Sequence, residues 1–339
     1  RSEARLELIL QTLVNALYAA SYLSLVAVGL VLIFGVMGVV NFAHGELYMA
    51  GAYAVFFLYI QQEMDFFLAV ALGLVFVGLL GLLMERALFR PLRGNPLGGL
   101  IASIGFLLVL QAAATLTFGV KKRPVPAPTQ EVITLMEGVA LPWPRAYVVI
   151  ASVLLLGALW IFLKRSRFGW ALRACAQDPE AAALQGISMN QTARLAMFIG
   201  AALAGVAGAL TAPLVEPEPI MGHGVIVSAF IIIIVGGVGS LSGAVLAAVL
   251  YALVKTFVTT YADGVLADIG RWRVSVGRPL QYDASDPIEP GEIAECLAAQ
   301  GTDLHSSWIK EYETPDGIVL GWVSPDLSEE TGPLWKSLT

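Results

Sequence analysis

Charged residues are scarce in this chain, and long stretches contain none. Asp, Glu, Lys and Arg make up 14% of its 339 residues, whereas soluble domains carry about 25%. Seven stretches lack all four types: 8–45, 47–62, 66–84, 94–120, 146–163, 195–215 and 219–254. Because a helix needs about 20 apolar residues to cross a bilayer, the pattern excludes a soluble domain over most of the chain. It predicts an all-α polytopic membrane protein with about eight hydrophobic transmembrane or re-entrant helical segments.

Residues that carry catalysis or bind metals are also few. The two cysteines, Cys175 and Cys296, provide no disulfide framework, and we interpret them as a small buried residue and a surface thiol. The three histidines form no His-Glu-x-x-His pattern, so we expect no metal site. The chain also lacks a Gly-x4-Gly-Lys-Ser/Thr loop and so cannot bind ATP in that way. We expect a non-catalytic protein without a cofactor.

The first and last of the charge-free stretches are too long for one straight span. As a single helix at about 1.5 Å per residue, each would exceed roughly 50 Å. Each must therefore bend, re-enter or fold back. We expect Gly35 and residues 38–41 to break the first stretch, and residues 236–243 to break the last. The stretch 47–62 is short enough to be re-entrant.

Basic residues in the short loops indicate the orientation of the chain. One loop carries Arg86, Arg90 and Arg93, and a later loop carries Lys164, Arg165, Arg167, Arg173 and Arg194. Because two spans separate these loops, both lie on one face, which the positive-inside rule assigns to the cytoplasm. The proline-rich loop 119–145 then lies outside, although its Lys121, Lys122 and Arg123 run against the rule.

Residues 173–188 form a polar island between two apolar stretches. A polar helix at this position can do little in lipid, but a soluble partner can grip it. Residues 179–186 predict a short helix with Pro179 in its first turn and Gly186 at its end. Glu180 lies in the first turn, where the helix dipole favours a carboxylate. Its alanines leave the helix slim enough to enter a cleft on a partner.

A second polar group, Asn41, His44 and Glu46, lies between the first two apolar stretches. Polar groups at membrane depth are costly and usually functional, so we interpret these three as part of a turn beside a translocation path. The alternative is an ordinary loop that caps two helices, with Asn41 as an N-cap. The neighbouring glycines and the charge favour this alternative.

Small residues recur at every fourth position in two of the apolar stretches. They are Gly200, Ala204, Gly208 and Ala212 in one stretch, and Gly239, Gly243 and Ala247 in the other. Such ladders let helix backbones approach closely in lipid. We therefore expect these residues, together with Gly236 and Gly237, to pack helices rather than to line a pore.

Three segments resemble a known family of transport proteins. Residues 34–53, which read Phe-Gly-Val-Met-Gly-Val-Val-Asn-Phe-Ala-His-Gly-Glu-Leu-Tyr-Met-Ala-Gly-Ala-Tyr, resemble the signature of the LivH-type permease subunits of branched-chain amino-acid ABC importers. Residues 173–188 resemble their cytoplasmic coupling segment, and residues 231–244 resemble their late glycine-rich stretch. The resemblance covers about residues 8–269, so we take residues 1–269 as a permease domain. The Ile-x-Leu-Pro element of the general importer pattern is absent.

The resemblance implies an importer in the inner membrane of a bacterium. Its partners would be a second, homologous permease subunit, two cytoplasmic ATP-binding cassette subunits, a periplasmic or lipid-anchored substrate-binding protein and membrane lipid, with no nucleic acid. The chain would form half of the path for branched-chain or related amino acids. The resemblance assigns ATPase coupling to the polar island, and the residues we expect to carry it are Arg173, Asp178, Glu180, Ala181, Ala182 and Gly186.

Three alternatives remain open. A permease of a urea or short-chain amide importer would carry the same motifs. A stand-alone secondary carrier or channel would more often show isolated ionisable residues within its spans, and the charge-free stretches show none. A structural membrane scaffold would not explain the polar island.

The chain changes character after residue 269. Residues 270–339 carry twelve acidic and five basic residues, a net charge of −7, and four of the seven tryptophans. So many aromatic residues argue against simple disorder, and 70 residues are compatible with a small α+β unit of marginal stability. Members of the family normally end with a further apolar span, so we interpret this polar tail as an added domain or an altered end. It would lie outside if residues 219–254 fold back as two passes.

Overall fold

The computed structural model describes residues 2–136, 138–262, 280–281, 309–314 and 317–322. The chain divides into two compact units, Arg1–Thr260 and Tyr261–Thr339, and each is described by itself. The boundary expected between residues 269 and 270 lies outside the described residues and stays a prediction.

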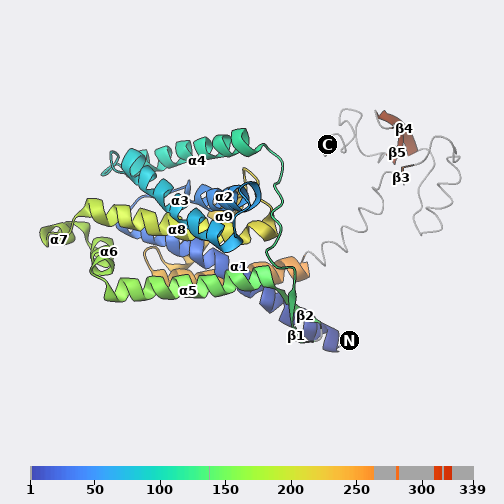
Figure 1. Ribbon diagram of the computed structural model, residues 1–339, viewed down its shortest axis with the longest axis horizontal. Helices are drawn as coiled ribbons and strands as arrows, with labels where there is room; N and C mark the ends of the chain where they lie inside the picture. The colour runs from blue at the N-terminus through green and yellow to red at the C-terminus, as the bar shows by residue number, and fades with distance from the viewer. Residues whose placement is uncertain (1, 137, 263–279, 282–308, 315–316, 323–339) are drawn as a thin grey trace. The chain divides into compact units, whose positions relative to one another are not determined.

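The first unit is built almost entirely of helices (Figure 1). They are α1 (Ser2–Met37), α2 (His44–Val55), α3 (Phe66–Met84), α4 (Pro96–Phe118), α5 (Trp143–Arg165), α6 (Arg167–Gln177), α7 (Pro179–Leu184), α8 (Met189–Val215), α9 (Gly222–Gly236) and α10 (Leu241–Phe257). Short π-helical segments continue α2, α3 and α10 at Phe56–Gln61, Glu85–Phe89 and Val258–Ala262. The strands β1 (Val132–Met136) and β2 (Val139–Pro142) form an antiparallel hairpin.

Six helical segments of the described part are long and apolar enough to cross a membrane. They are Leu6–Met37, Phe66–Phe89, Pro96–Phe118, Trp143–Arg165, Met189–Val215 and Leu241–Tyr261. The shorter α9, with 15 residues, and α2 with its π-helical continuation complete the apolar segments. The expected helical, polytopic fold is thus confirmed, and the chain is a multi-pass membrane protein.

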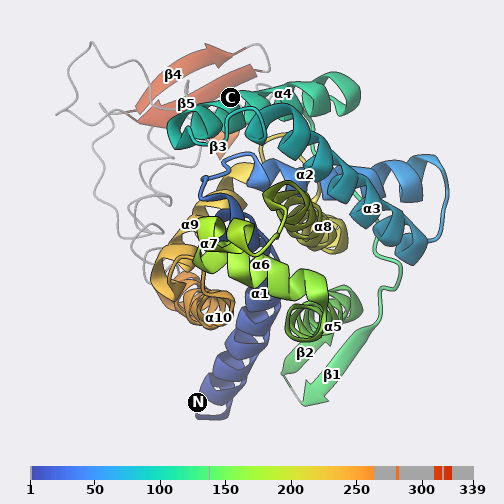
Figure 2. The same ribbon diagram turned by 90° about the vertical axis from the view of Figure 1, so that its left-hand side faces the viewer.

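Helices α1 and α8 form the centre of the first unit. The apolar windows of these two helices are 78% and 83% buried, against 22% for both α4 and the last span. Figure 2 shows α8 enclosed by α1, α2, α3 and α5, and all four pack against it. Because α4 and α10 leave most of their apolar surface uncovered by this chain, they face lipid or a partner.

The two long apolar stretches break at glycine-rich turns. Helix α1 runs through Gly35 without interruption and ends at Met37, so the break expected at Gly35 is wrong, whereas the break at residues 38–41 is confirmed. Glycine is tolerated within membrane helices because its neighbours satisfy the backbone. The last stretch breaks after Gly236, as expected, in a turn where Gly237 and Gly239 adopt φ of 88° and 87°.

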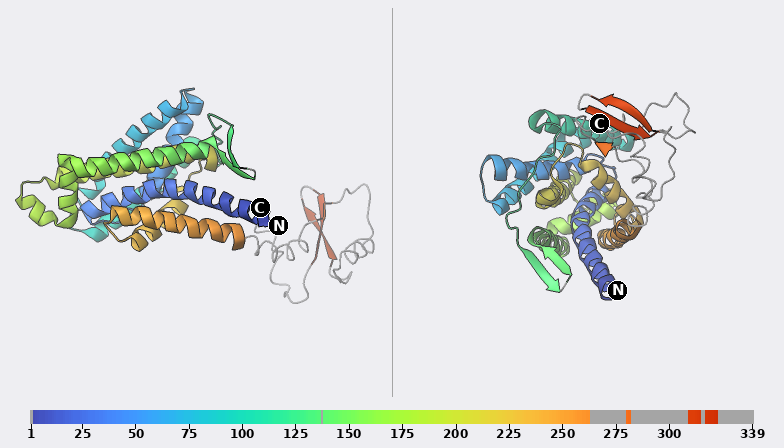
Figure 3. Two further views of the ribbon diagram at one scale, coloured as in Figure 1. Left: turned by 90° about the horizontal axis from the view of Figure 1, so that it is seen from below. Right: turned by 90° about the vertical axis from the view of Figure 1, so that its right-hand side faces the viewer.

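The two ends of the bundle differ in what they carry. Arg93 hydrogen-bonds to Asn190 at the start of α8, so the two basic loops lie at one end, as expected. At the other end, Gln11 of α1 holds the hairpin: its side chain donates to the Ala140 carbonyl at 3.2 Å and accepts from the Ala140 amide at 2.9 Å. Figure 3 shows α6 and α7 at one end of the bundle and the hairpin at the other.

The second unit contains three described strands. They are β3 (Leu280–Gln281), β4 (Ile309–Thr314) and β5 (Gly317–Trp322). They form an antiparallel sheet in the order β3-β5-β4. The other residues of the polar tail, and with them the expectation of a complete α+β unit, lie outside the described residues.

Candidate functional site

Helix α7 lies in the polar island and is fixed at both ends by its own sequence. The Asp178 carboxylate accepts hydrogen bonds from the amides of Glu180 and Ala181, both at 3.0 Å. At the other end Gly186 adopts φ of 81°, and the amide of Ile187 donates to the Ala182 carbonyl at 3.1 Å. Together with the bond from the Gly186 amide to the Ala183 carbonyl at 3.0 Å, this bond forms a Schellman cap at the end of the helix. The short helix expected from Pro179 to its terminal glycine is confirmed as Pro179–Leu184.

The caps matter because six residues do not hold a helix on their own. Nucleation is unfavourable, and isolated helices shorter than about 12 residues are marginal in water. The Asp178 side chain satisfies two of the free amides at the start, and the glycine turn satisfies carbonyls at the end. The result is a short helix whose two ends are both fixed by hydrogen bonds.

Most of α7 is uncovered by this chain. Glu180, Ala181 and Gly186 are exposed, and only Ala182 among the helix residues is buried. Leu184, which sequence reasoning missed, is 88% exposed at the end of the helix. A single exposed apolar side chain does not by itself mark an interface, so Leu184 matters here only as part of the uncovered surface of α7. The signal in the sequence was a single leucine within a polar segment.

Arg173 lies on α6 rather than on α7. Its guanidinium stands 5.0 Å from the centroid of the exposed Trp170 ring, which is within cation–π distance. Cys175 on the same helix is a free, buried thiol, as expected for a small core residue.

An ion pair between the half-buried Arg93 and a buried carboxylate lies beside the polar island, and sequence reasoning missed it. Arg93 pairs with Glu85, whose side chain is 0% exposed, and also hydrogen-bonds to Asn190. Asn190 lies two residues beyond the end of the polar island. This Arg93 clasp therefore ties the end of α3 to the start of α8 beside the polar island.

Asn41, His44 and Glu46 are all completely buried. Asn41 lies in the loop between α1 and α2, whereas His44 and Glu46 lie in the first turn of α2. Asn41 is not the N-cap, because Ala43 occupies that position. Instead the Asn41 carboxamide oxygen accepts from the Ala43 amide at 3.1 Å, which fixes the turn into α2. His44 makes a 3.0 Å hydrogen bond through Nε2 to the Val26 carbonyl and so joins α2 to α1.

Glu46 opens a polar chain that runs to the surface of this subunit. Its Oε1 accepts a 2.9 Å hydrogen bond from Gln111 of α4. The same amide nitrogen lies 3.2 Å from Nδ1 of His223, an exposed residue of α9. Sequence reasoning missed Gln111 and His223. A glutamine within a charge-free span was the available signal.

Close packing of α2 on α8 positions this polar chain. Helix α2 lies between α4 and α8 in Figures 1 and 2. A Cβ added to Gly208 would lie 1.8 Å from the Tyr48 carbonyl oxygen, so the backbones touch there. The Tyr48 hydroxyl also hydrogen-bonds to that of Thr211 at 2.6 Å. The position of Glu46 thus depends on the absence of a side chain at one residue of α8.

The other small residues that we expected to pack helices lie either in contacts of α8 with α1 or at the turn between α9 and α10. Gly200 packs its backbone against Gly29 of α1, and Ala204 is fully buried in α8. Gly236 and Gly243 touch backbone to backbone across the turn between α9 and α10. Gly237 and Gly239 lie within that turn and provide its left-handed backbone.

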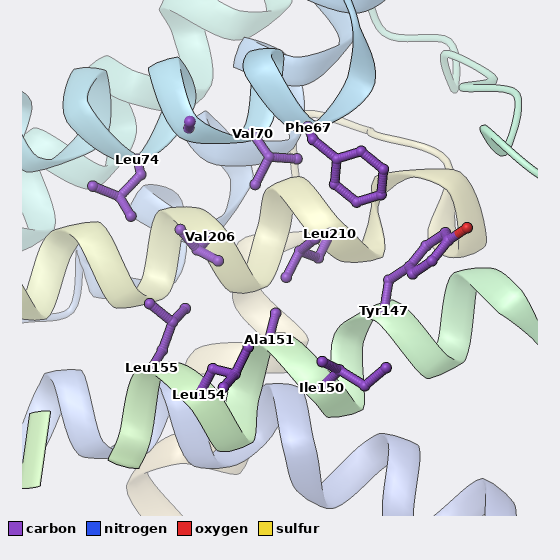
Figure 4. Close-up of a pocket in the computed structure, with 11 residues that line it drawn as sticks. Phe67, Val70, Leu74, Tyr147, Ile150, Ala151, Leu154, Leu155, Val206 and Leu210 are labelled. Atoms are coloured by element: carbon purple, nitrogen blue, oxygen red, sulfur yellow. The ribbon is translucent and has the colours of Figure 1, made fainter. Parts of the chain in front are cut away.

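An apolar groove of about 370 Å³ lies between α3, α5 and α8. Figure 4 shows the side chains that line it, among them Phe67, Leu74, Leu154 and Leu210. Its only side-chain polar group, the Tyr147 hydroxyl, is already hydrogen-bonded to Thr129 at 3.2 Å. Moving a charged amino acid through such a groove would leave its polar groups unsatisfied.

The described residues show no group of three or more His, Cys, Asp and Glu side chains that could hold a metal ion.

Comparison with known proteins places the chain in one family. The family described as branched-chain amino acid transport system / permease component matches residues 12–270. The high-affinity branched-chain amino acid transport system permease protein BraD of Pseudomonas aeruginosa is 35% identical over 270 residues, which cover 73% of this chain and 85% of BraD.

Two further relatives carry the name LivH. The Escherichia coli K12 protein is 33% identical over 276 residues, 77% of this chain and 89% of its own. A probable LivH permease of Methanocaldococcus jannaschii is 28% identical over 266 residues, 73% and 80% of the two chains. No solved structure matches the chain at a significant level. The chain belongs to the family of permease components of branched-chain amino acid transport systems.

Proposed function

We propose that this chain forms half of the translocation path of an ATP-driven importer for branched-chain or related amino acids, and that an ATPase subunit grips α7. The observation that carries the proposal is α7 itself, a short helix capped at both ends with Glu180 and Leu184 uncovered. The substrate class follows from the names of the relatives, all of which are branched-chain amino acid permeases.

The proposed assembly contains a second permease subunit, two cytoplasmic ATP-binding cassette subunits and a periplasmic or lipid-anchored binding protein. It lies in the bacterial inner membrane, with α6 and α7 on the cytoplasmic side. The basic residues of that end support the orientation. The uncovered apolar faces of α4 and α10 provide room for the second permease and for lipid.

Asn41, His44 and Glu46 lie beside the path in this proposal, with different tasks. Asn41 and His44 hold α2 through buried hydrogen bonds. Glu46 is the member of the group that connects to an exposed residue, through Gln111.

Glu46 is also the feature that a secondary carrier would show, since it is an ionisable residue buried among membrane helices. The two mechanisms differ in their energy source. Uptake that requires ATP and the binding protein supports the importer. Uptake driven by an ion gradient alone would contradict it.

Glu180→Lys should uncouple transport from ATP hydrolysis while the complex still assembles. The exposed carboxylate lies in the first turn of α7, where a positive charge opposes the helix dipole and changes the surface offered to the ATPase. In proteoliposomes that contain the assembled complex, we expect binding-protein-stimulated ATPase activity and uptake to fall about tenfold or more, since 1.4 kcal/mol of lost contact suffices for that factor.

Glu131→Lys is the matched control, because Glu131 is an exposed acid next to the hairpin at the other end of the bundle. It should leave both activities unchanged. If Glu180→Lys retains wild-type ATPase stimulation and uptake, α7 is not the coupling element.

A membrane-impermeant thiol reagent should distinguish the two ends of the bundle in intact cells. On a background without Cys175 and Cys296, we expect a cysteine at Glu131 to react at once. A cysteine at the exposed Leu184 should react only after the membrane is opened. The opposite pattern would reverse the proposed orientation.

A further inference from the structure

Glu46 is a buried carboxylate without a cation. It is completely buried, and among the residues that the structure describes no basic side chain lies within ion-pairing distance of it. Its Oε1 accepts one hydrogen bond from Gln111, whereas its Oε2 has no partner in the described part of the chain. A buried charge without a partner is strongly unfavourable unless something completes its environment.

The route from Glu46 to the surface is short and polar. Gln111 is half-buried and His223 is exposed, and the two side chains meet at 3.2 Å above the carboxylate. They cover Glu46 with acceptor and donor groups that a ligand can replace. Movement of these two side chains would free Oε1 of the carboxylate and Nδ1 of His223 for a ligand.

The rest of that face is apolar. Leu108 lies one turn before Gln111 on α4, and Val227 lies one turn after His223 on α9. Residues three and four apart share one face of a helix, and both of these side chains are exposed. The face therefore combines one buried carboxyl group with exposed apolar side chains on either side.

We propose that Glu46, beneath Gln111 and His223, receives the ammonium group of the transported amino acid on its way through the membrane. The proposal rests on the function proposed above and names the group of the substrate that this chain recognises. An ammonium group has three donors, which match the free Oε2, the Oε1 that Gln111 releases and Nδ1 of His223. The apolar surface beside them fits an aliphatic side chain.

The test places a thiol on α9 next to His223 without changing the three residues. Gly224 is exposed, and an added Cβ there would meet no described atom within 4 Å. The complete complex with Gly224→Cys, on a background without Cys175 and Cys296, is treated with 2-aminoethyl methanethiosulfonate, which carries an ammonium group, and with the neutral methyl reagent. A cysteine at Glu131 corrects for the intrinsic rates of the two reagents.

We expect the ammonium reagent to react about tenfold or more faster than the neutral one at Gly224→Cys, since a carboxylate reached past His223 attracts a cation and does not attract a neutral reagent. Glu46→Gln should remove this preference, and Glu46→Asp should retain it. Leucine delivered by the binding protein should slow the reaction. Glu46→Gln should also lower uptake at unchanged complex yield.

Equal rates for the two reagents, a preference that survives Glu46→Gln, or no reaction at all would overturn the proposal. These outcomes do not depend on α7, because the labelling requires no ATP hydrolysis. If Glu180→Lys uncouples transport but the ammonium preference is absent, the proposed function stands and this inference fails. If the ammonium preference is present in a chain that does not couple to an ATPase, this inference stands and the proposed function fails.

Discussion

Gly208→Ala should prevent stable assembly of the helical bundle. The added Cβ would lie 1.8 Å from the Tyr48 carbonyl oxygen, and a Cβ at Gly51 would lie 1.9 Å from the Gly205 carbonyl oxygen. Both contacts are with backbone, which cannot rotate away as a side chain can. Inserting a methyl group into a packed core usually costs about 1–3 kcal/mol. Here α2 and α8 must separate, so we expect at least about 3 kcal/mol, a large part of the 5–15 kcal/mol that holds a typical domain.

The measurement is the yield and melting temperature of the complex in detergent. Gly105→Ala and Gly157→Ala are matched controls. Both glycines are exposed, on α4 and α5 respectively, and an added Cβ would meet no described atom within 4 Å. These variants should melt within a few degrees of the wild type, since surface substitutions usually change stability by less than about 0.5 kcal/mol. A Gly208→Ala complex with wild-type yield and melting temperature would contradict the close approach of the two helices.

Arg93→Ala should destabilise the protein by about 3–5 kcal/mol, because it leaves the buried Glu85 carboxylate without its partner. The variant also removes the hydrogen bond to Asn190, and with it the Arg93 clasp between the end of α3 and the start of α8. We therefore expect uptake per assembled complex to fall as well, since the clasp adjoins the proposed coupling segment. Thermal unfolding and uptake are measured on the same preparation.

Two further variants distinguish loss of the Arg93–Glu85 ion pair from loss of a positive charge anywhere in the loop. Arg90→Ala removes an exposed basic residue of the same loop and should change little. Arg93→Met combined with Glu85→Leu replaces the pair by apolar side chains and should recover most of the stability, because buried pairs can be exchanged for packed apolar groups. If the Arg93→Ala and Arg90→Ala variants have the same melting temperature, the Arg93 clasp contributes nothing to the stability of the fold.

The polar island shows how far local rules extend. Pro179 and Gly186 predicted the two ends of α7 because each residue acts on the backbone next to it: proline fits the first turn, and glycine fits the left-handed turn after the last. The same rules failed at Gly35. A glycine ends a helix only where the following chain turns away, and α1 continues for two more residues to Met37.

The group of Asn41, His44 and Glu46 shows what local sequence rules cannot predict. Asn41, His44 and Glu46 attracted notice as polar residues between apolar stretches, but the sequence left a capping loop as the favoured alternative. The tertiary structure buries all three residues and divides them by their partners: Asn41 and His44 hold α2, and Glu46 contacts Gln111 of α4. None of this is visible from residues 41–46 alone.

The sequence by itself determined which segments lie in the membrane, where most of them end, and that a capped polar helix stands between two of them. Hydropathy and capping act over a few residues, so one segment at a time suffices to predict them. The tertiary structure alone decided which polar side chains meet. His44 reaches a carbonyl 18 positions away, Glu46 a side chain 65 positions away, and Arg93 one 97 positions away. Such pairs form only when helices from distant parts of the chain pack together, and the glycines that allow α2 to touch α8 bring Glu46 to its place.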